Sequence, residues 1–476
     1  MSFASPLFLW FFLPLVLLAV VALPRTWRNG VVAVASLVFY ATGAGATTLL
    51  LLGCMVVNFV AGRAVEPHEG TVGRRRRHVL TGVVALDLVV LAVWKYAGFA
   101  TQQAATISHW FGLDLGTVSL VLPIGISFYT FHHISYVVDV YRGQRPALRE
   151  PVAFVAYIAM FPQLIAGPVV RYHEIADQLQ QVRTHRLDDV AAGFPRFALG
   201  LVKKVVVADS IAPIANACYA TPTAEMTTGI AWLGAVAYAL QLYFDFSGYS
   251  DMAIGLGRMI GFRLPENFDR PYSAVTITDF WRRWHMSLSR WFRDYLYIPL
   301  GGNRGGTAQT YRNLVVVFLL TGLWHGAAWT FVLWGAFHGA LLVLERVTGT
   351  GAVPADPRRV ALRRACTLVL VVLGWVVFRS PDLATAGSVL SSLVVPRPGG
   401  LTDVVAASVT HQRVLVLVLA ATVVLLPRRR STGRFVAADR GLPAGALRLG
   451  VMTVGVGYAA ILVGAGTFSP FLYFQF

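Results

Sequence analysis

Apolar stretches of about 18 to 20 residues recur along the whole chain, and they constrain its fold more than any other feature. Each is long enough to cross a bilayer core about 30 Å thick as a helix. Only 13% of the 476 residues are charged and the mean hydropathy is +0.62, whereas about a quarter of a soluble globular protein is charged. The sequence therefore predicts an all-α, polytopic integral membrane protein with about ten to thirteen membrane segments, the shorter ones re-entrant or interfacial.

The net charge of +17 does not require a nucleic-acid partner. In a membrane protein the excess of arginine and lysine is explained by cytoplasmic loops that face anionic lipid headgroups. Arg25, Arg28 and the runs at 74–77 and 428–430 flank apolar stretches and are placed on the cytoplasmic side. The N-terminus has no basic segment before its apolar run and is read as a first membrane helix, not a cleaved signal.

Three well-separated cysteines, Cys54, Cys218 and Cys366, predict neither a disulfide framework nor a zinc site, and no metal site is expected. No internal repeat and no separate soluble domain is visible. The whole chain, 1–476, is therefore predicted to form a single membrane domain.

Residues 276–297, TITDFWRRWHMSLSRWFRDYLY, are predicted to form one amphipathic helix. Aromatic and aliphatic side chains recur at helical spacing on one face, and arginines supply much of the rest. Such a helix is typical of the headgroup layer, where it lies without spanning. Thr276 and Asp279 predict a cap at its start. His285 falls on the aromatic face, where a packed, locally hydrogen-bonded histidine and a functional one fit the spacing equally well.

Residues 314–344 form an apolar run with a histidine, His325, near its middle. As one helix the run would be about 46 Å long, more than the bilayer core, so it either tilts strongly or breaks where Gly322 and Gly326 flank His325. A polar group at this depth indicates by default a functional site that faces a cavity, and a neutral imidazole satisfied by one carbonyl is the alternative. His338 faces away from His325 in an unbroken helix and is predicted to be structural.

The glycine-rich segment IPLGGNRGG, residues 298–306, can form a backbone nest for phosphate or a simple turn, and the turn is favoured. Other polar residues in apolar surroundings, such as Asp245 and Asp251, are predicted mainly to hydrogen-bond between helices. Orienting a histidine or binding a hydroxyl-rich substrate is the alternative for these two carboxylates.

Five blocks of the sequence together resemble the membrane-bound O-acyltransferase family. They are WRRWHMSLSRWFRDYLYIPLGGNRGG at 281–306, GLWHGAAWTFVLWGAFHG at 322–339, LPIGISFYTFHHISYVVDVYRG at 122–143, MFPQLIAGPVVRY at 160–172 and QLYFDFSGYSDMAIGLG at 241–257. The likeness is greatest to the bacterial branch that acetylates alginate, to which the teichoic acid D-alanyl transfer proteins are related. It covers a core of about residues 1–346 and is weaker over 347–476.

The resemblance implies a helical core around a central funnel and acyl transfer from a thioester to a hydroxyl. The family's catalytic histidine, in the LWHG block, corresponds to His325, and the second active-site histidine of the bacterial branch corresponds to His285. His325 would act as general base or carry a transient acyl group, while His285 would orient the donor or stabilise the oxyanion. Expected donor or substrate contacts lie in or beside these blocks: Arg283, Arg293, Asn303, Arg304, Trp324 and Asp251. The arginines fit lipid phosphates equally well.

The same resemblance implies acetyl-CoA, or another acyl thioester, as the donor substrate and no tightly bound cofactor. The acetyl group would pass towards a cell-surface or exported polysaccharide, through an extracytoplasmic partner protein. Membrane lipids are the other expected partners, and the expected location is the bacterial cytoplasmic membrane. A lipid or protein O-acyltransferase of the same family and a polysaccharide-precursor transporter remain alternatives, although no inverted repeat typical of transporters is visible.

Overall fold

A computed structural model describes residues 1–67, 73–181, 186–426, 441–466, 469 and 471. Helices account for all the regular secondary structure in these ranges, which contain no strand. The predicted all-α fold is therefore confirmed. The arginine run at 428–430, predicted to be cytoplasmic, lies outside the described residues.

Six helical segments are long and apolar enough to cross a membrane, which confirms a polytopic membrane protein. They are Arg25–Val65, Gly73–His109, Thr228–Met259, Trp329–Val347, Pro357–Arg379 and Gly445–Gly464, with shorter apolar helices at Phe8–Ala22, Leu383–Val394 and His411–Leu425. Within the described ranges this count is below the expected ten to thirteen segments. One reason is that the first of these segments contains two apolar helices in succession, Arg28–Ala44 and Thr48–Val65. Another is that the helix Ile126–Tyr141 has only 16 residues, too few to count as a span.

The chain divides into two compact units, although a single domain was expected. The first comprises residues 1–194 and 253–265, and the second comprises 195–252 and 266–476. Two helices, α9 (Arg186–Leu201) and α11 (Thr228–Met259), contribute residues to both units. The expectation of one membrane domain over 1–476 stays a prediction.

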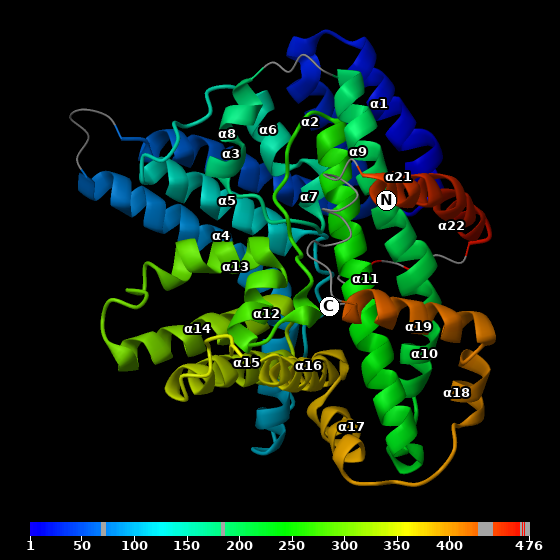
Figure 1. Ribbon diagram of the computed structural model, residues 1–476. Coiled ribbons are helices and arrows are strands. Elements are labelled where there is room, and N and C mark those ends of the chain that lie inside the picture. The colour runs from blue at the N-terminus through cyan, green and yellow to red at the C-terminus, as the bar shows by residue number, and fades with distance from the viewer. Residues whose placement is uncertain (68–72, 182–185, 427–440, 467–468, 470, 472–476) are drawn as a thin grey trace. The chain divides into compact units, whose positions relative to one another are not determined.

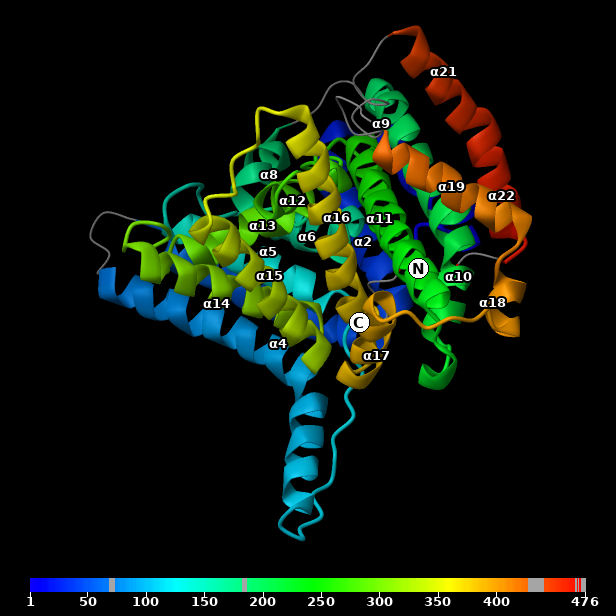
Figure 2. The ribbon, with the colours of Figure 1, turned by 60° about the horizontal axis from the view of Figure 1, so that its bottom comes forward.

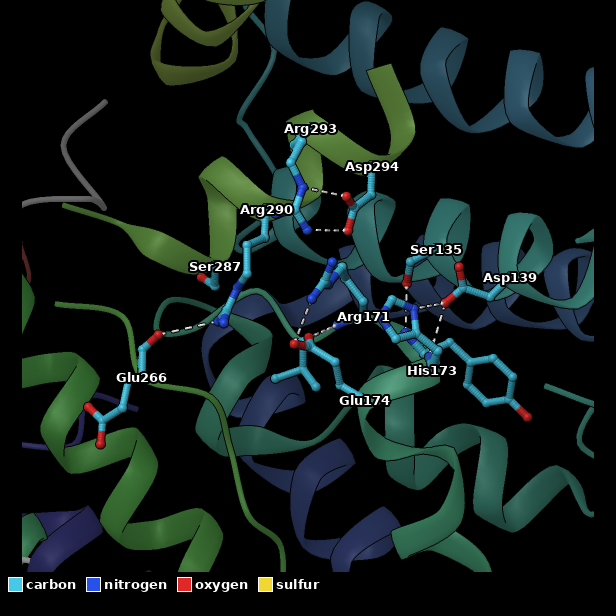
Figure 3. Close-up of polar contacts among 12 residues, drawn as sticks. Ser135, Asp139, Arg171, His173, Glu174, Glu266, Ser287, Arg290, Arg293 and Asp294 are labelled. Atoms are coloured by element: carbon cyan, nitrogen blue, oxygen red, sulfur yellow. Dashed lines mark hydrogen bonds and ion pairs between the residues drawn. The ribbon is translucent and has the colours of Figure 1, made fainter. Parts of the chain in front are cut away.

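The first unit is built from short and long helices, of which α3, α4 and α5 lie against one another (Figure 1). Its helices are η1 (Phe8–Phe12), α1 (Leu13–Ala22), α2 (Arg28–Ala44), α3 (Thr48–Val65), α4 (Gly73–His109), α5 (Ile126–Tyr141), α6 (Pro151–Ile158), α7 (Phe161–Leu164) and α8 (Tyr172–Gln180). Buried polar groups tie this unit together. Asp139 on α5 accepts hydrogen bonds from the backbone N–H of His173 at 3.0 Å and pairs with its Nδ1 at 2.9 Å, and Arg171 pairs with Glu174 at 2.8 Å (Figure 3).

The second unit contains the remaining predicted functional segments. Its helices are η4 (Val202–Ala208), α10 (Asp209–Tyr219), α12 (Ile277–Arg283), α13 (Met286–Phe292), η7 (Arg293–Tyr297), α14 (Thr307–His325), α15 (Trp329–Val347), α16 (Pro357–Arg379), α17 (Leu383–Val394), α18 (Asp403–Ser408), α19 (His411–Leu425), α21 (Leu442–Gly450), η8 (Val451–Gly455) and α22 (Val456–Gly464). Figure 2 shows α14 and α15 side by side as a hairpin, with α16 following.

Glycines allow α14 and α15 to approach closely. A Cβ on Gly322 would lie 2.2 Å from the carbonyl oxygen of Phe331, and a Cβ on Gly335 would lie 2.4 Å from that of Phe318. Small residues at helix contacts are how membrane helices gain packing, since lipid tails are as apolar as the side chains. The hairpin is therefore held in one register, and that register positions His325.

Candidate active site

The predicted interfacial helix is broken at its histidine. α12 ends at Arg283 and α13 begins at Met286, and between them His285 has φ +43° and ψ +52°. This left-handed conformation costs a residue with a Cβ about 1–2 kcal/mol, so surrounding contacts must hold it. The prediction of one continuous helix over 276–297 is therefore wrong. Helical spacing cannot show a turn that is imposed by partners elsewhere in the chain.

The start of α12 is capped from two directions. The Thr276 hydroxyl accepts a hydrogen bond from the backbone N–H of Asp279 at 3.0 Å, which confirms the predicted cap. The carboxylate of Glu345, on α15, accepts the backbone N–H groups of Ile277 at 2.8 Å and Thr278 at 2.9 Å. The first N–H groups of a helix have no partner within it, and its positive end favours a carboxylate. Glu345 thereby fixes α12 against α15.

His285 is anchored by a buried asparagine. Its Nδ1 lies 3.1 Å from Oδ1 of Asn267, an oxygen that also accepts the backbone N–H of Ser287 at 3.3 Å and the Ser287 hydroxyl at 2.8 Å. The Asn267 amide nitrogen donates to the Ser250 hydroxyl at 3.1 Å, and its backbone carbonyl accepts the N–H of Met286 at 2.9 Å. These bonds surround the left-handed residue and hold it in place.

The network assigns the protonation of the His285 ring. The backbone N–H of Ser287 can only donate, so Oδ1 of Asn267 must face it, and Nδ1 of His285 then carries the ring hydrogen. Nε2 carries the lone pair and has no hydrogen-bond partner in the described part of the chain. Burial lowers the pKa of His285 to about 3, because the charged ring would lose its water. The ring is therefore neutral near pH 7 and presents a hydrogen-bond acceptor.

His325 is the last residue of α14. Gly326 follows it in an extended conformation, φ −166° and ψ +160°, so the long apolar run breaks at this glycine. The break, one of the two predicted outcomes, is confirmed. The imidazole is 7% exposed and meets the rings of Trp334 and Phe378 edge-on, each at a centroid distance of 5.1 Å. Aromatic rings thus form much of the surroundings of His325.

One indole lies against both predicted histidines. The Trp324 ring centroid is 4.9 Å from that of His325 and 6.1 Å from that of His285. Phe246, on α11, contacts the His285 ring at 4.7 Å. The structure therefore brings together two histidines that are forty residues apart in the sequence.

His338 does not face away from His325 as the unbroken-helix argument predicted. Both imidazoles contact Trp334, His325 at 5.1 Å and His338 at 5.0 Å. That argument failed because the break at Gly326 resets the helical phase. His338 is fully buried, and neither ring nitrogen has a hydrogen-bond partner among the described residues.

A cavity of about 610 Å³ lies between α12, α13, α14 and α15. Apolar side chains of α13 and α14 form part of its wall, and Trp281 on α12 and Thr321 on α14 also line it. Its charged lining residues are Arg282, Arg293, Glu345 and Arg346, and Asn303 is among its polar ones. Thr321 lies one helical turn before His325, so the cavity wall reaches close to the histidines.

The glycine-rich segment 298–306 forms an ordered turn. The N–H groups of Gly301, Gly302 and Arg304 donate to carbonyls within the segment or just before it, so they are not available as a phosphate nest. Asn313 on α14 donates to the carbonyls of Leu300 at 3.2 Å and Gly302 at 3.1 Å. The favoured interpretation as a turn agrees with these contacts.

Comparison with known proteins decides the family. The model of the membrane-bound O-acyltransferase (MBOAT) family matches residues 149–371. The probable alginate O-acetylase AlgI of Azotobacter vinelandii is 44% identical over 506 aligned positions, which cover 100% of both chains. This chain belongs to the MBOAT family.

More distant MBOAT relatives act on other polymers. The peptidoglycan O-acetyltransferase of Helicobacter pylori is 36% identical over 82% of this chain and 79% of its own. The teichoic acid D-alanyltransferase of Bacillus subtilis is 28% identical over 47% of this chain and 59% of its own. The family and these relatives identify the chain as a membrane O-acyltransferase.

The structure places the other predicted MBOAT site residues in different surroundings. Arg293 and Asn303 line the cavity; Arg293 pairs with Asp294 at 2.7 Å, and Asn303 accepts a hydrogen bond from the Tyr297 hydroxyl (Figure 3 shows the Arg293–Asp294 pair). Arg283 pairs with Asp279 at 2.8 Å.

The remaining predicted contacts have structural partners or stand at the surface. Asp251 lies between two cations, with Oδ1 2.7 Å from Nε of Arg196 and Oδ2 2.6 Å from Nζ of Lys203. Arg304 is exposed in the turn. Their roles towards a substrate stay predictions. Within the described ranges no group of three or more His, Cys, Asp or Glu side chains is arranged to hold a metal ion.

Sequence reasoning missed Asn267 and Glu345. Each acts on a segment that is 18 or more residues away, so local spacing carries no sign of the contact. Asn267 stands in the polar stretch PENFD, which has no helical or strand period. The adjacent polar residues Glu266 and Asn267, shortly after a long apolar stretch, are the one signal in the sequence that could have drawn attention to Asn267.

Proposed function

We propose that this membrane O-acyltransferase transfers an acetyl group from acetyl-CoA to a hydroxyl of a cell-surface or exported polysaccharide. The observation that carries the proposal is the pairing of His285 and His325 around the Trp324 ring, beside a cavity lined by arginines. The names of the relatives, which specify alginate and peptidoglycan O-acetylation, support a polysaccharide acceptor.

His325 acts as the general base in this proposal. Its imidazole takes the proton of the attacking hydroxyl while the hydroxyl oxygen forms a bond to the thioester carbonyl carbon. The carbon–sulfur bond then breaks, and the leaving thiolate takes the proton back from the imidazolium as CoA thiol. The position of His325 at the C-terminus of α14 supports this role, since the negative end of a helix stabilises a cation. In the alternative mechanism, the His325 ring first takes the acetyl group from the thioester as a transient acyl-histidine, and the hydroxyl then attacks this intermediate.

The donor would enter through the cavity beside the histidines. A volume of about 610 Å³ suits part of a cofactor-sized molecule, and Arg282 and Arg293 offer guanidinium groups for its phosphates. Trp324 would contact the donor nearer to the thioester, whereas Asn303, in the turn at the opposite end of α14, would contact it nearer to the phosphates. In this proposal CoA is a substrate that comes and goes, and an extracytoplasmic partner protein receives the acetyl group or presents the polysaccharide. The bacterial cytoplasmic membrane is the proposed location.

Transfer of labelled acetyl tests this function. Purified protein in proteoliposomes is given acetyl-CoA labelled in the acetyl group and an exported polysaccharide fraction from the same bacterium. The extracytoplasmic protein fraction of that bacterium is added as the source of the partner, and label on the polysaccharide and free CoA are measured. The proposal predicts both products in equal amounts. A polysaccharide-precursor transporter would move the glycan without acetyl-CoA and without labelling it. Label that appears only in lipid or protein would indicate a lipid or protein O-acyltransferase of the same family.

A further inference from the structure

Two pairs of residues that are adjacent in the sequence, Ser250–Asp251 and Glu266–Asn267, hold the side chain of His285 through their hydrogen bonds. On α11, Ser250 bonds to Asn267, and the next residue, Asp251, bonds to Arg196. In the segment before α12, Asn267 bonds to His285, and the preceding residue, Glu266, bonds to Arg196.

Arg196 therefore clamps the two segments that meet at Asn267. Its Nη1 and Nη2 lie 3.1 Å and 2.7 Å from the two carboxylate oxygens of Glu266, and its Nε lies 2.7 Å from Oδ1 of Asp251. The Arg196 side chain is 5% exposed, so these charge-assisted bonds lie in a region with little water. Lys203 adds a second cation to Asp251 at 2.6 Å. A clamp of this kind fixes Ser250 and Asn267 relative to each other.

We infer that Asn267 is a positioning residue that holds His285 with its ring hydrogen on Nδ1, so that Nε2 accepts a hydrogen bond from a bound substrate. The inference rests on the proposed function, since it assigns a direction to the second histidine of that site. It gives His285 a role different from oxyanion stabilisation, because a lone pair cannot donate to an oxyanion. The recognised group is an O–H or N–H donor, which a sugar hydroxyl of the acceptor and an amide of the donor's pantetheine arm both supply.

The surroundings of His285 contain few charges that compete with this arrangement. On α11 and in the segment before α12 the nearest charged side chains in sequence are Asp251 and Glu266, and both are paired with Arg196. On α14 the titratable neighbour is His325, beyond the Trp324 ring. α12 ends in Arg283, which is paired with Asp279. The amide of Asn267 is thus the polar group that determines which His285 nitrogen carries hydrogen.

Two substitutions at one position test the inference. Asn267→Ala removes the acceptor for Nδ1–H, and Asn267→Asp keeps an acceptor and adds a negative charge beside the ring. We expect Asn267→Ala to lower kcat by about 10- to 100-fold, by analogy with the loss of a group that orients a metal-bound histidine. We expect Asn267→Asp to restore at least a tenth of the activity and to raise the acid limb of the pH–rate profile by one pH unit or more, because a buried carboxylate favours the imidazolium.

The matched control is Asn313→Asp, which introduces the same carboxylate at another buried asparagine, whose side chain bonds to the turn 298–306 and to the neighbouring Arg312. Its pH profile should remain that of the unmodified protein. The inference would be overturned if both Asn267 variants had the kcat and the pH profile of the unmodified protein. Asn267 would then be a purely structural residue. If Asn267→Ala does not fold, histidine-selective 15N NMR of the unmodified protein decides: a His285 ring protonated at Nε2 would overturn the inference.

The substrate group is read from the Michaelis constants. A selective rise in KM for the polysaccharide in Asn267→Ala identifies an acceptor hydroxyl, and a selective rise in KM for acetyl-CoA identifies a donor amide. A failure of the proposed function looks different, since unmodified protein would then show no acetyl transfer at all, whatever the state of His285.

Discussion

His285 and His338 are both fully buried in the second unit, yet the structure holds them in different ways. His285 has a left-handed backbone, one ring nitrogen bonded to Asn267 and the other left as a lone pair. His338 lies within a regular helix among aromatic rings, and neither ring nitrogen has a partner in the described part of the chain. Burial alone therefore does not mark a functional histidine. A strained backbone and a ring of fixed orientation distinguish His285.

His325 completes this comparison from a third position. It shares Trp334 with His338 and Trp324 with His285, so it lies between the packed and the anchored histidine. His325 is slightly exposed at the end of α14, next to the break at Gly326. The following helix, α15, begins at Trp329, three residues after that glycine. If the comparison is sound, substitutions at the three histidines should have effects of clearly different size.

The largest effect is expected for His325→Ala. Removal of the proposed general base should lower acetyl transfer by about 10²- to 10⁴-fold. The protein should still fold, because Trp334 and Phe378, which contact His325, also pack directly against each other. Transfer of labelled acetyl by purified protein measures the rate, and thermal unfolding checks the fold. A variant that keeps a tenth of the activity would rule out His325 as the base.

His285→Ala is expected to cost less, about 10²-fold. The substitution removes a substrate contact and, because alanine keeps a Cβ, leaves the left-handed backbone as strained as before, but it also leaves the proposed base in place. Steady-state kinetics with both substrates measures the loss. A loss larger than that of His325→Ala would reverse the roles assigned to the two histidines.

Glu345→Gln is expected to act through the position of α12. The two carboxylate oxygens of Glu345 accept one N–H group each, and the amide nitrogen that replaces one of them cannot accept. One of the N–H groups of Ile277 and Thr278 therefore loses its acceptor, and the free energy of unfolding should fall by about 1–3 kcal/mol. Thermal or denaturant unfolding in detergent gives the change. Unaltered stability would show that the cap at Thr276 is sufficient for α12.

His338→Leu is expected to have the smallest effect. The replacement introduces an apolar side chain of similar volume and leaves no protein partner unsatisfied, so it should cost less than about 1.5 kcal/mol and leave acetyl transfer within about threefold. The same transfer assay gives the rate. A large loss of activity with an intact fold would show that His338, like His285, takes part in the reaction.

Much of the fold could be predicted from the sequence, because apolar length and periodicity are local signals. The membrane helices and the break at Gly326 follow from residues that are neighbours in the chain. The turn at His285 does not, since the anchor at Asn267 and the clamp at Arg196 come from distant segments. The predicted pair His285 and His325 meets at Trp324. Asp251 has an ion-pair partner, Arg196, in a distant segment that spacing could not reveal, whereas the partner of Arg283 lies four residues away on the same helix, at a spacing that the sequence shows.

The O-acetyl content of the cell-surface polysaccharide tests the central claim most directly. The gene is deleted in its own bacterium, and the strain is complemented with the unmodified protein, His325→Ala or His338→Leu at matched membrane levels. The account predicts that the unmodified protein and His338→Leu restore O-acetylation and that His325→Ala does not. Restoration by His325→Ala, or failure of His338→Leu at a normal protein level, would contradict it.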